Sequence, residues 1–216
     1  LTKFLNHHIF IENEFHFQTI YMILAKLKES TRSQHEALES VVDVMNRTLT
    51  GEGYKSLLVK FYRFYSTIEP RLPGGKMLEA GLDIRSRLKT QLLEADLEYL
   101  GVAPSSTSPW TGVPQTRNAA EAFGAIYVME GATLGGQVIT RHLNQHIGLT
   151  PEQGGAFFNS YGREVGPMWK AFGAAVTAYS EKHPEDDDVI VRSAGETFDS
   201  FRKCFEQPLT AEAAGL

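Results

Sequence analysis

From Ala25 onward, apolar residues recur at spacings of three and four over long segments, and runs that alternate apolar and polar residues are scarce. This period is typical of amphipathic helices, whereas a half-buried strand alternates every two residues. The sequence therefore predicts an all-α fold, a multi-helix bundle. The chain has 216 residues, an ordinary length for one domain, so a single core is expected.

Glycine and proline divide the chain into its expected elements. We expect two consecutive helices over 25–49, ended by Gly51 and Gly53, and further helices over 54–69, 76–100, 118–147, 151–160, 167–182 and 186–206. The helix over 54–69 carries an aromatic-rich apolar stripe, which predicts a core position. The Gly-, Pro-, Ser- and Thr-rich stretch 101–116 is expected to be a long surface loop.

The two ends of the chain lack the helical period of the middle. We expect residues 1–21 to be a poorly ordered N-terminal extension, residues 22–207 to form the domain, and residues 208–216 to be a C-terminal tail. No stretch approaches the ~20 apolar residues that a membrane span needs. The N-terminus also lacks the pattern of a signal peptide, so the sequence favours a cytoplasmic protein.

Composition and missing motifs exclude several classes of function. The net charge of −5 gives no strong positive field for nucleic acid or an anionic membrane. The only cysteine, Cys204, rules out an internal disulfide and a cysteine-held iron–sulfur cluster. Phosphate-binding, nucleophile-elbow and zincin motifs are absent, as is the Glu-x-x-His motif of di-iron bundles. His142 and His146 could clamp a metal from one helix face, but a polar solvent face is the preferred interpretation.

The segment GAIYVMEGATLGGQVI, residues 124–139, is unusual because it places the three glycines Gly131, Gly135 and Gly136, in addition to Gly124, in the interior of an expected helix. Each costs ~1 kcal/mol relative to alanine in a helix interior. At 100° per residue, Gly124, Gly131 and Gly135 fall on one stripe and make that face nearly flat. Such a face permits close packing of another helix or of a planar ligand, and the pair that ends in Gly136 offers a place to kink.

The segment LKESTRSQHEALE, residues 27–39, carries a histidine with charged neighbours. In a helix, Lys28 and Arg32 lie on the same face as His35. Glu39, one turn further on, could accept a hydrogen bond from one ring nitrogen and so strengthen donation of the other to a metal. The alternative interpretation is a polar amphipathic helix with an ordinary His–Glu pair.

The two segments together favour a haem site. Haem iron takes an axial histidine, its propionates pair with lysine or arginine, and its flat apolar face can lie against glycine backbone. LKESTRSQHEALE and EGATLGGQVI also resemble the proximal and distal helix signatures of the haem oxygenases, and the similarity extends over about residues 27 to 205. The distal segment is most similar to bacterial members, including those that make biliverdin for bacteriophytochromes.

The resemblance implies a haem sandwiched between a proximal helix and a kinked distal helix. The matched residues are His35 as iron ligand, Glu39 as its acceptor, Lys28, Arg32 and Lys170 as propionate partners, and Gly131, Gly135 and Gly136 as distal backbone over the haem. The implied reaction cleaves haem, both substrate and cofactor, to biliverdin, CO and iron. It uses O₂ and an external electron donor such as ferredoxin or a reductase, and a phytochrome could receive the biliverdin.

Two positions depart from the family pattern. Many relatives carry an aspartate directly after the first distal glycine, where this chain has Ala132, and Ala174 stands where a second cation is expected. Proton delivery is therefore unassigned. The alternatives are a non-catalytic haem-binding or haem-transfer protein on the same fold, and a helical interaction module that binds no tetrapyrrole.

Overall fold

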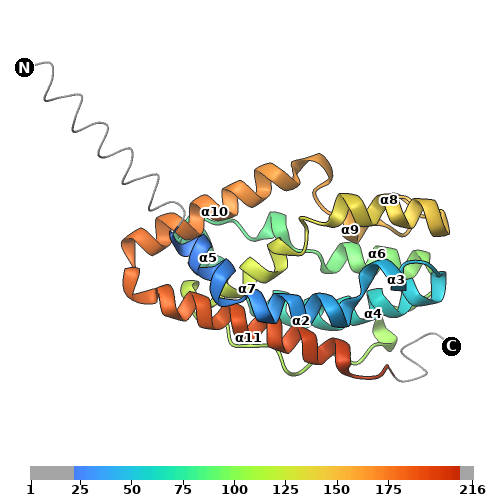
Figure 1. The fold of residues 1–216 in the computed structure, drawn as a ribbon, viewed down its shortest axis with the longest axis horizontal. Coiled ribbons are helices and arrows are strands. Elements are labelled where there is room, and N and C mark those ends of the chain that lie inside the picture. Colours follow the sequence, from blue (N-terminus) through green and yellow to red (C-terminus); the bar gives the residue numbers. More distant parts are fainter. Residues whose placement is uncertain (1–21, 210–216) are drawn as a thin grey trace, which may run out of the picture.

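The computed structural model describes residues 22–209, and within them it contains helices, turns and isolated bridges but no strand (Figure 1). Residues 22–30 are helical, followed by α2 (Arg32–Val42), α3 (Val44–Arg47), α4 (Gly51–Ile68), α5 (Gly74–Glu79), α6 (Thr90–Tyr99), α7 (Ala119–Gly131), α8 (Gly136–Ile147), α9 (Ala156–Asn159), α10 (Val165–Lys182) and α11 (Asp187–Glu206). Short 3₁₀ turns are η1 (Glu69–Arg71), η2 (Arg85–Arg87), η3 (Pro104–Ser106), η4 (Gly162–Glu164) and η5 (Pro184–Asp186). The all-α prediction is confirmed. The predictions for residues 1–21 and 210–216 lie outside the described residues.

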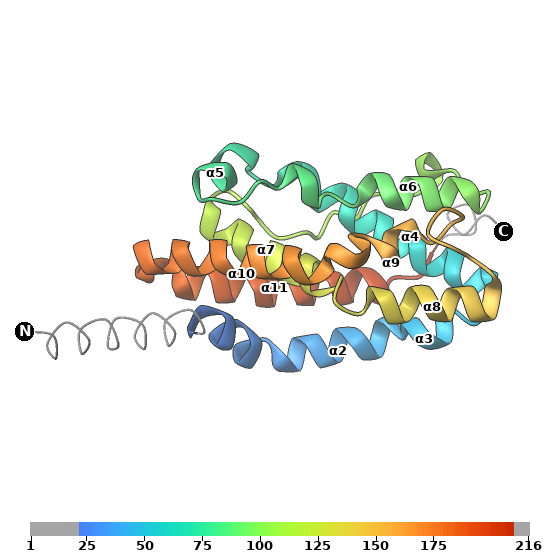
Figure 2. The same ribbon diagram turned by 90° about the horizontal axis from the view of Figure 1, so that it is seen from above.

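The helices lie in layers around α7. Figure 2 shows α7, α10 and α11 between the α2–α3 segment on one side and α5 and α6 on the other. Helix α11 packs along both α7 and α2, and α4 packs against α6 and α11. Helix α7 is buried along nearly its whole length, which matches its apolar sequence on all sides.

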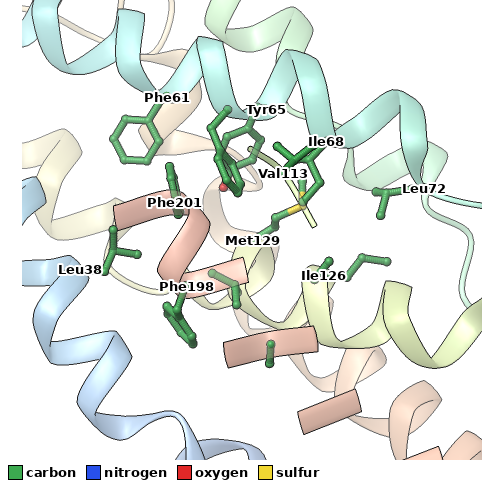
Figure 3. Close-up of a cluster of buried hydrophobic side chains, with 14 of the residues drawn as sticks. Leu38, Phe61, Tyr65, Ile68, Leu72, Val113, Ile126, Met129, Phe198 and Phe201 are labelled. Atoms are coloured by element: carbon green, nitrogen blue, oxygen red, sulfur yellow. The ribbon is translucent and has the colours of Figure 1, made fainter. Parts of the chain in front are cut away.

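The core is built on the aromatic face of α4, as its sequence predicts (Figure 3). The ring of Phe64 stacks on Phe201 of α11 with centroids 4.1 Å apart, and Phe61 meets the edge of the same ring at 5.5 Å. Offset stacks and edge contacts of this kind add to the stability gained from burial alone. The contacts fix α11 against α4.

Several helix boundaries differ from those expected. The first helical region breaks at Thr31 and again at Asp43, whose left-handed φ of 44° ends α2. Gly51 does not end this region but starts α4, where the Thr50 side chain accepts a hydrogen bond from the Gly53 amide at 3.1 Å. A side-chain cap of this kind supplies a start signal that the glycines obscured.

Two expected helices are shorter than predicted. The range 76–100 divides into α5, η2 and α6 because Gly81 takes a positive φ of 87° and turns the chain. In the range 151–160 only α9 is helical, and the buried Asp96 carboxylate accepts hydrogen bonds from its first amides, Ala156 at 2.9 Å and Phe157 at 2.8 Å. A contact between distant segments thus fixes where α9 begins.

The stretch 101–116 is largely irregular, as expected, but it packs on the helices. The Trp110 indole N–H donates to the Ser200 hydroxyl of α11 at 3.0 Å, and that hydroxyl donates to the Gly112 carbonyl at 2.7 Å. The loop is therefore held across α11.

Candidate functional site

The expected helix over 118–147 is interrupted between α7 and α8. Residues 132–135 form turns in which the Gly131 carbonyl accepts from the Leu134 amide at 3.1 Å and the Thr133 carbonyl accepts from the Gly136 amide at 3.0 Å. These bonds span three residues rather than the four of an α-helix. We call residues 131–136 the helix break; it confirms the expected kink and spreads it over a full turn.

Two glycines of the helix break face open space. A Cβ added at Gly131 would meet no atom within 4 Å, and one at Gly135 would touch only the end of the Ile139 side chain at 3.7 Å. Neither glycine has a positive φ. Neither the backbone conformation nor the packing of the described residues therefore requires glycine at these positions.

Gly124 and Gly136 are different, because an added Cβ would collide with the backbone of a neighbouring element. At Gly124 the obstacle is the Ile190 carbonyl of α11, and at Gly136 it is the Phe158 carbonyl of α9. These glycines allow close helix packing. The flat stripe expected to run from Gly124 to Gly135 is wrong at its start, and Gly136 is buried against α9 rather than turned to the open side.

The open side of α8 faces the α2–α3 segment, beside which it lies in Figure 2. Gly135, Val138 and His142 follow one another at spacings of three and four, so they share a helix face. The His142 Nε2 lies 2.9 Å from the Met45 carbonyl of α3, which fixes the direction of that face. Val138 is nevertheless 56% exposed and its neighbour Leu134 is 49% exposed. Apolar surface is thus left uncovered beside the helix break.

His142 is half-buried as a contact between α8 and α3, not on the polar solvent face expected for it. Its ring lies 4.0 Å from that of the exposed His146. Among the described residues, no group of three or more His, Cys, Asp or Glu side chains could hold a metal ion.

His35 lies on α2 with its side chain 54% exposed. Its Nε2 is 3.7 Å from a Glu39 carboxylate oxygen, near enough for attraction but longer than a hydrogen bond. The ring edge packs on Phe198 of α11 at 5.6 Å between centroids. The imidazole is therefore supported on one side and accessible to a ligand on another.

Phe198 and Tyr127 connect the His35 helix to α7. The Tyr127 ring meets the edge of the Phe198 ring with centroids 6.4 Å apart. Burial raises the pKa of Tyr127, so its hydroxyl stays protonated at neutral pH. Tyr127 stands one turn before Gly131. The sequence did not single out either aromatic residue.

Lys28, in the helical residues 22–30, and Arg32, on α2 with His35, are both exposed, but only Arg32 has an ion-pair partner. The Arg32 guanidinium pairs with Glu29, three residues earlier. Lys28 makes no ion pair with any residue in the range 22–209. Exposed pairs of this kind contribute little, so Arg32 can exchange Glu29 for an anionic ligand at small cost.

Lys170 belongs to α10, which packs on the helical residues 22–30 that carry Lys28. At Gly173, an added Cβ would come within 3.1 Å of the Leu24 side chain, so α10 packs closely on residues 22–30 there. The two helices run in opposite directions in Figures 1 and 2. Lys28 is one turn after Leu24, and Lys170 is about one turn before Gly173, so both lysines lie in the same direction from the contact.

A buried ionic cluster lies behind the helix break, and the sequence did not assign it to the site. The carboxylate of Glu130 accepts from the Arg87 guanidinium and, at 2.6 Å, from the Tyr161 hydroxyl. Lys89 Nζ donates to that same hydroxyl at 2.6 Å, and Arg87 also donates to the Met168 carbonyl at 3.2 Å. Burial lowers the pKa of Lys89 to about 8. We call Arg87, Lys89, Glu130 and Tyr161 the Glu130 cluster.

One signal could have found this cluster. Glu130 is a charged residue inside a helix that is apolar on all sides, and a buried charge must be paired. Its partners come from distant parts of the chain, and nothing in their local sequence points to Glu130.

The comparisons with known proteins agree with the fold described above. The family model described as Heme oxygenase matches residues 22–207. No curated protein gives a significant match. Within residues 22–209, no helix is both long enough and apolar enough to cross a lipid bilayer.

Two solved structures share the fold. The NO- and CO-bound haem oxygenase of Neisseria meningitidis has a TM-score of 0.75 at 21% identity, covering 90% of this chain and 92% of that one. The haem oxygenase of Leptospira interrogans has a TM-score of 0.69 at 18% identity, covering 85% and 98%. Identity at this level shows the fold alone, whereas the family match spans most of the chain, and so this chain belongs to the haem oxygenase family.

Proposed function

We propose that this protein is a haem oxygenase that cleaves haem to biliverdin, CO and iron, with O₂ and electrons from an external donor. One observation carries the proposal. Gly131 and Gly135 leave open space that neither their backbone conformation nor their packing explains, beside the apolar surface of α8 that faces the α2–α3 segment. A planar apolar ligand that needs close approach to backbone accounts for both features.

The donor set fits haem better than a bare metal ion. Haem brings four equatorial nitrogens of its own, so the protein needs to supply only one axial side chain. His35 offers an accessible imidazole, while residues 22–209 contain no cluster of three metal-binding side chains. When bound, haem would supply both the iron that reacts with O₂ and the macrocycle that is cleaved.

The remaining predicted residues have roles that their positions support. We propose that Glu39 accepts a hydrogen bond from the non-ligating nitrogen of His35 once that ring is fixed, which requires closing their 3.7 Å separation. Lys28, Arg32 and Lys170 would bind the propionates, since all three are exposed and Lys28 and Lys170 lie in the same direction from the contact of their helices.

The helix break would form the distal wall with Gly131 and Gly135, and Gly136 would hold that wall against α9. A wall without side chains lets haem approach and excludes bulky groups from its face. Ala132 carries no acidic group, so we propose that protons arrive through water held by backbone carbonyls of the helix break. The carbonyl of Gly131 accepts one hydrogen bond, from Leu134, and keeps a second lone pair.

The test is conversion of bound haem. Haemin is added to the full chain, and ascorbate is then supplied in air with a trap for CO. We expect one biliverdin and one CO per haem. Haem that binds through histidine but stays intact would contradict the proposal.

That contradicting result would favour the alternative, a non-catalytic haem-binding or haem-transfer protein. The specific observation behind this alternative is Ala132, which is exposed at the helix break and offers no proton-relay group. Binding requires only the imidazole and the open glycine surface, so it would survive the loss of proton delivery.

A further inference from the structure

The Glu130 cluster buries several charges at a cost in folding free energy, and haem binding alone does not require it. Arg87, Lys89 and Glu130 are each less than 10% exposed. Burying charges costs several kcal/mol per ion, and the attraction between them often does no more than offset that cost. A paired charge network inside a small helical protein is therefore weak evidence for stability and a candidate for a specific positional role.

The cluster is attached to the first half of the helix break. Glu130 is the residue before Gly131, and its backbone carbonyl accepts from the Thr133 amide at 3.0 Å and from the Thr133 hydroxyl at 2.7 Å. The Glu130 side chain is held by Arg87 and Tyr161 on the buried side. The side chain of Glu130 thus holds the last turn of α7 on its buried side. The backbone carbonyl of the same residue holds the first turn of the helix break.

The segment that carries Tyr161 also holds the second half of the helix break. The Gly162 carbonyl accepts from the Gln137 side chain of α8 at 3.0 Å, and the Phe158 carbonyl packs directly on Gly136. Residues 158–162 therefore contact α7 through Tyr161 and α8 through the other two positions. One short segment sets the relative placement of the two helices at the break.

We propose that Glu130 and Tyr161 are positioning residues that hold the helix break at the distance and angle at which Gly131 and Gly135 bind the planar ligand. They do so without touching that ligand, because Glu130 faces the buried side of α7. The inference rests on the proposed function for the identity of the ligand, but the placement of the break can be measured without it.

The sharpest variant is Tyr161→Phe, which removes one hydroxyl and keeps the ring. Its matched control is Ser193→Ala: the Ser193 hydroxyl is also buried and also donates to α7 at 2.6 Å, to the Glu121 carbonyl near the other end of the helix. Each change removes one hydrogen bond to α7, and Tyr161→Phe also removes the one that its hydroxyl accepts from Lys89. A purely structural role would lower the stability of both variants without a specific effect on the amides of the helix break.

Hydrogen exchange provides the readout without haem. We expect the amides of Leu134 and Gly136 to exchange at least fivefold faster in Tyr161→Phe than in wild type, and to be unchanged in Ser193→Ala, although both variants melt a few degrees lower. Equal exchange at these amides in both variants would overturn the proposal. If Tyr161→Phe does not fold, Glu130→Gln is measured in the same way and judged by the same result.

Haemin binding provides the second readout. We expect Tyr161→Phe to weaken haemin binding about tenfold, as groups that orient a ligand site without touching it commonly do, and to shift the C–O stretching frequency of the ferrous–CO complex. Ser193→Ala should match wild type in both. An unchanged affinity and frequency in Tyr161→Phe would also overturn the proposal. Failure of wild type to bind haemin would instead refute the proposed function and leave the exchange result to judge the positioning role.

Discussion

Gly135 and Gly136 are neighbours with opposite reasons to lack a side chain. An added Cβ at Gly136 would strike the Phe158 carbonyl, whereas at Gly135 it would meet only the end of Ile139. Sequence alone cannot separate the two, since both are glycines in the same motif. Substitution can distinguish their roles, because only at Gly136 does the packing of the folded protein require glycine.

Gly135→Leu should therefore fold. Its backbone has ordinary helical angles, with φ −82° and ψ −8°, so replacing glycine should change stability by no more than about 1 kcal/mol. The leucine side chain would occupy the space proposed for haem, and we expect haemin affinity to fall at least tenfold. Gly75→Leu, at another glycine with open space around it, is the control and should bind like wild type. Undiminished haemin affinity in Gly135→Leu would contradict the assignment.

Cys204 is a buried thiol of α11 with no role in the site. Burial raises its pKa to about 11, and its Sγ lies 3.8 Å from the Lys60 carbonyl. Since the thiolate is the reactive form, the native thiol should be inert. We expect no reaction with a disulfide reagent at pH 8 within an hour, and full reaction after unfolding in urea. Rapid modification of the native protein would mean that α11 opens locally.

At the scale of the helix, the sequence predicted elements well where their own residues decide the structure. Helix α4 was predicted from its aromatic-rich apolar stripe, and the ranges of α4 and α11 lie close to the predicted 54–69 and 186–206. The prediction failed where a distant contact decides. Asp96 of α6 caps the start of α9, and Asp43 ends α2 with a left-handed backbone geometry that few residues adopt. Neither boundary can therefore be predicted from the neighbouring sequence.

Gly124 tests the packing of α7 on α11. Gly124→Ala would push a methyl group into the Ile190 carbonyl, and since backbone cannot rotate away, the two helices must separate. Overpacking of this kind costs about 1–3 kcal/mol. Gly131→Ala on the same helix has nothing to collide with and should stay within about 1 kcal/mol of wild type. Urea unfolding of the two variants measures the contrast, and equal stabilities would refute the close contact.

At the scale of the whole molecule, the sequence predicts only part of the proposed site. His35 and the glycines could be predicted because they stand in two contiguous segments. Phe198, Tyr161 and Arg87 were missed because each meets the site through the tertiary fold, from elements far along the chain. The charged Glu130 in an apolar helix was the one visible trace of the cluster.

The Glu130 cluster should give the folding free energy a pH dependence. Burial lowers the pKa of Lys89 from its ordinary 10.5 to about 8, so above pH 8 the unfolded chain holds a proton that the folded chain has released. Stability from this group therefore rises with pH, by at most about 1.4 kcal/mol per unit.

The window for this measurement is pH 7.5 to 9, below the range in which the tyrosines oppose the trend. Cys204 opposes it as the pH approaches 9.0, the ordinary pKa of its thiol, but this contribution is the same in wild type and in a Lys89 variant and cancels in their comparison. We expect urea unfolding to give wild type a gain over this window that Lys89→Met lacks, whatever the absolute stability of that variant. Parallel curves for the two proteins would show that Lys89 keeps its ordinary pKa when folded.

The central claim is that His35 binds haem iron opposite the glycines of the helix break. It is tested most directly by the absorption spectrum of haemin-loaded His35→Ala, with and without added imidazole. We predict that His35→Ala loses the histidine-ligated spectrum and that imidazole, which fits the space left by the side chain, restores it. The control His146→Ala, which removes an exposed histidine of α8, should match wild type. An unchanged spectrum in His35→Ala, or a lost one in His146→Ala, would contradict the claim.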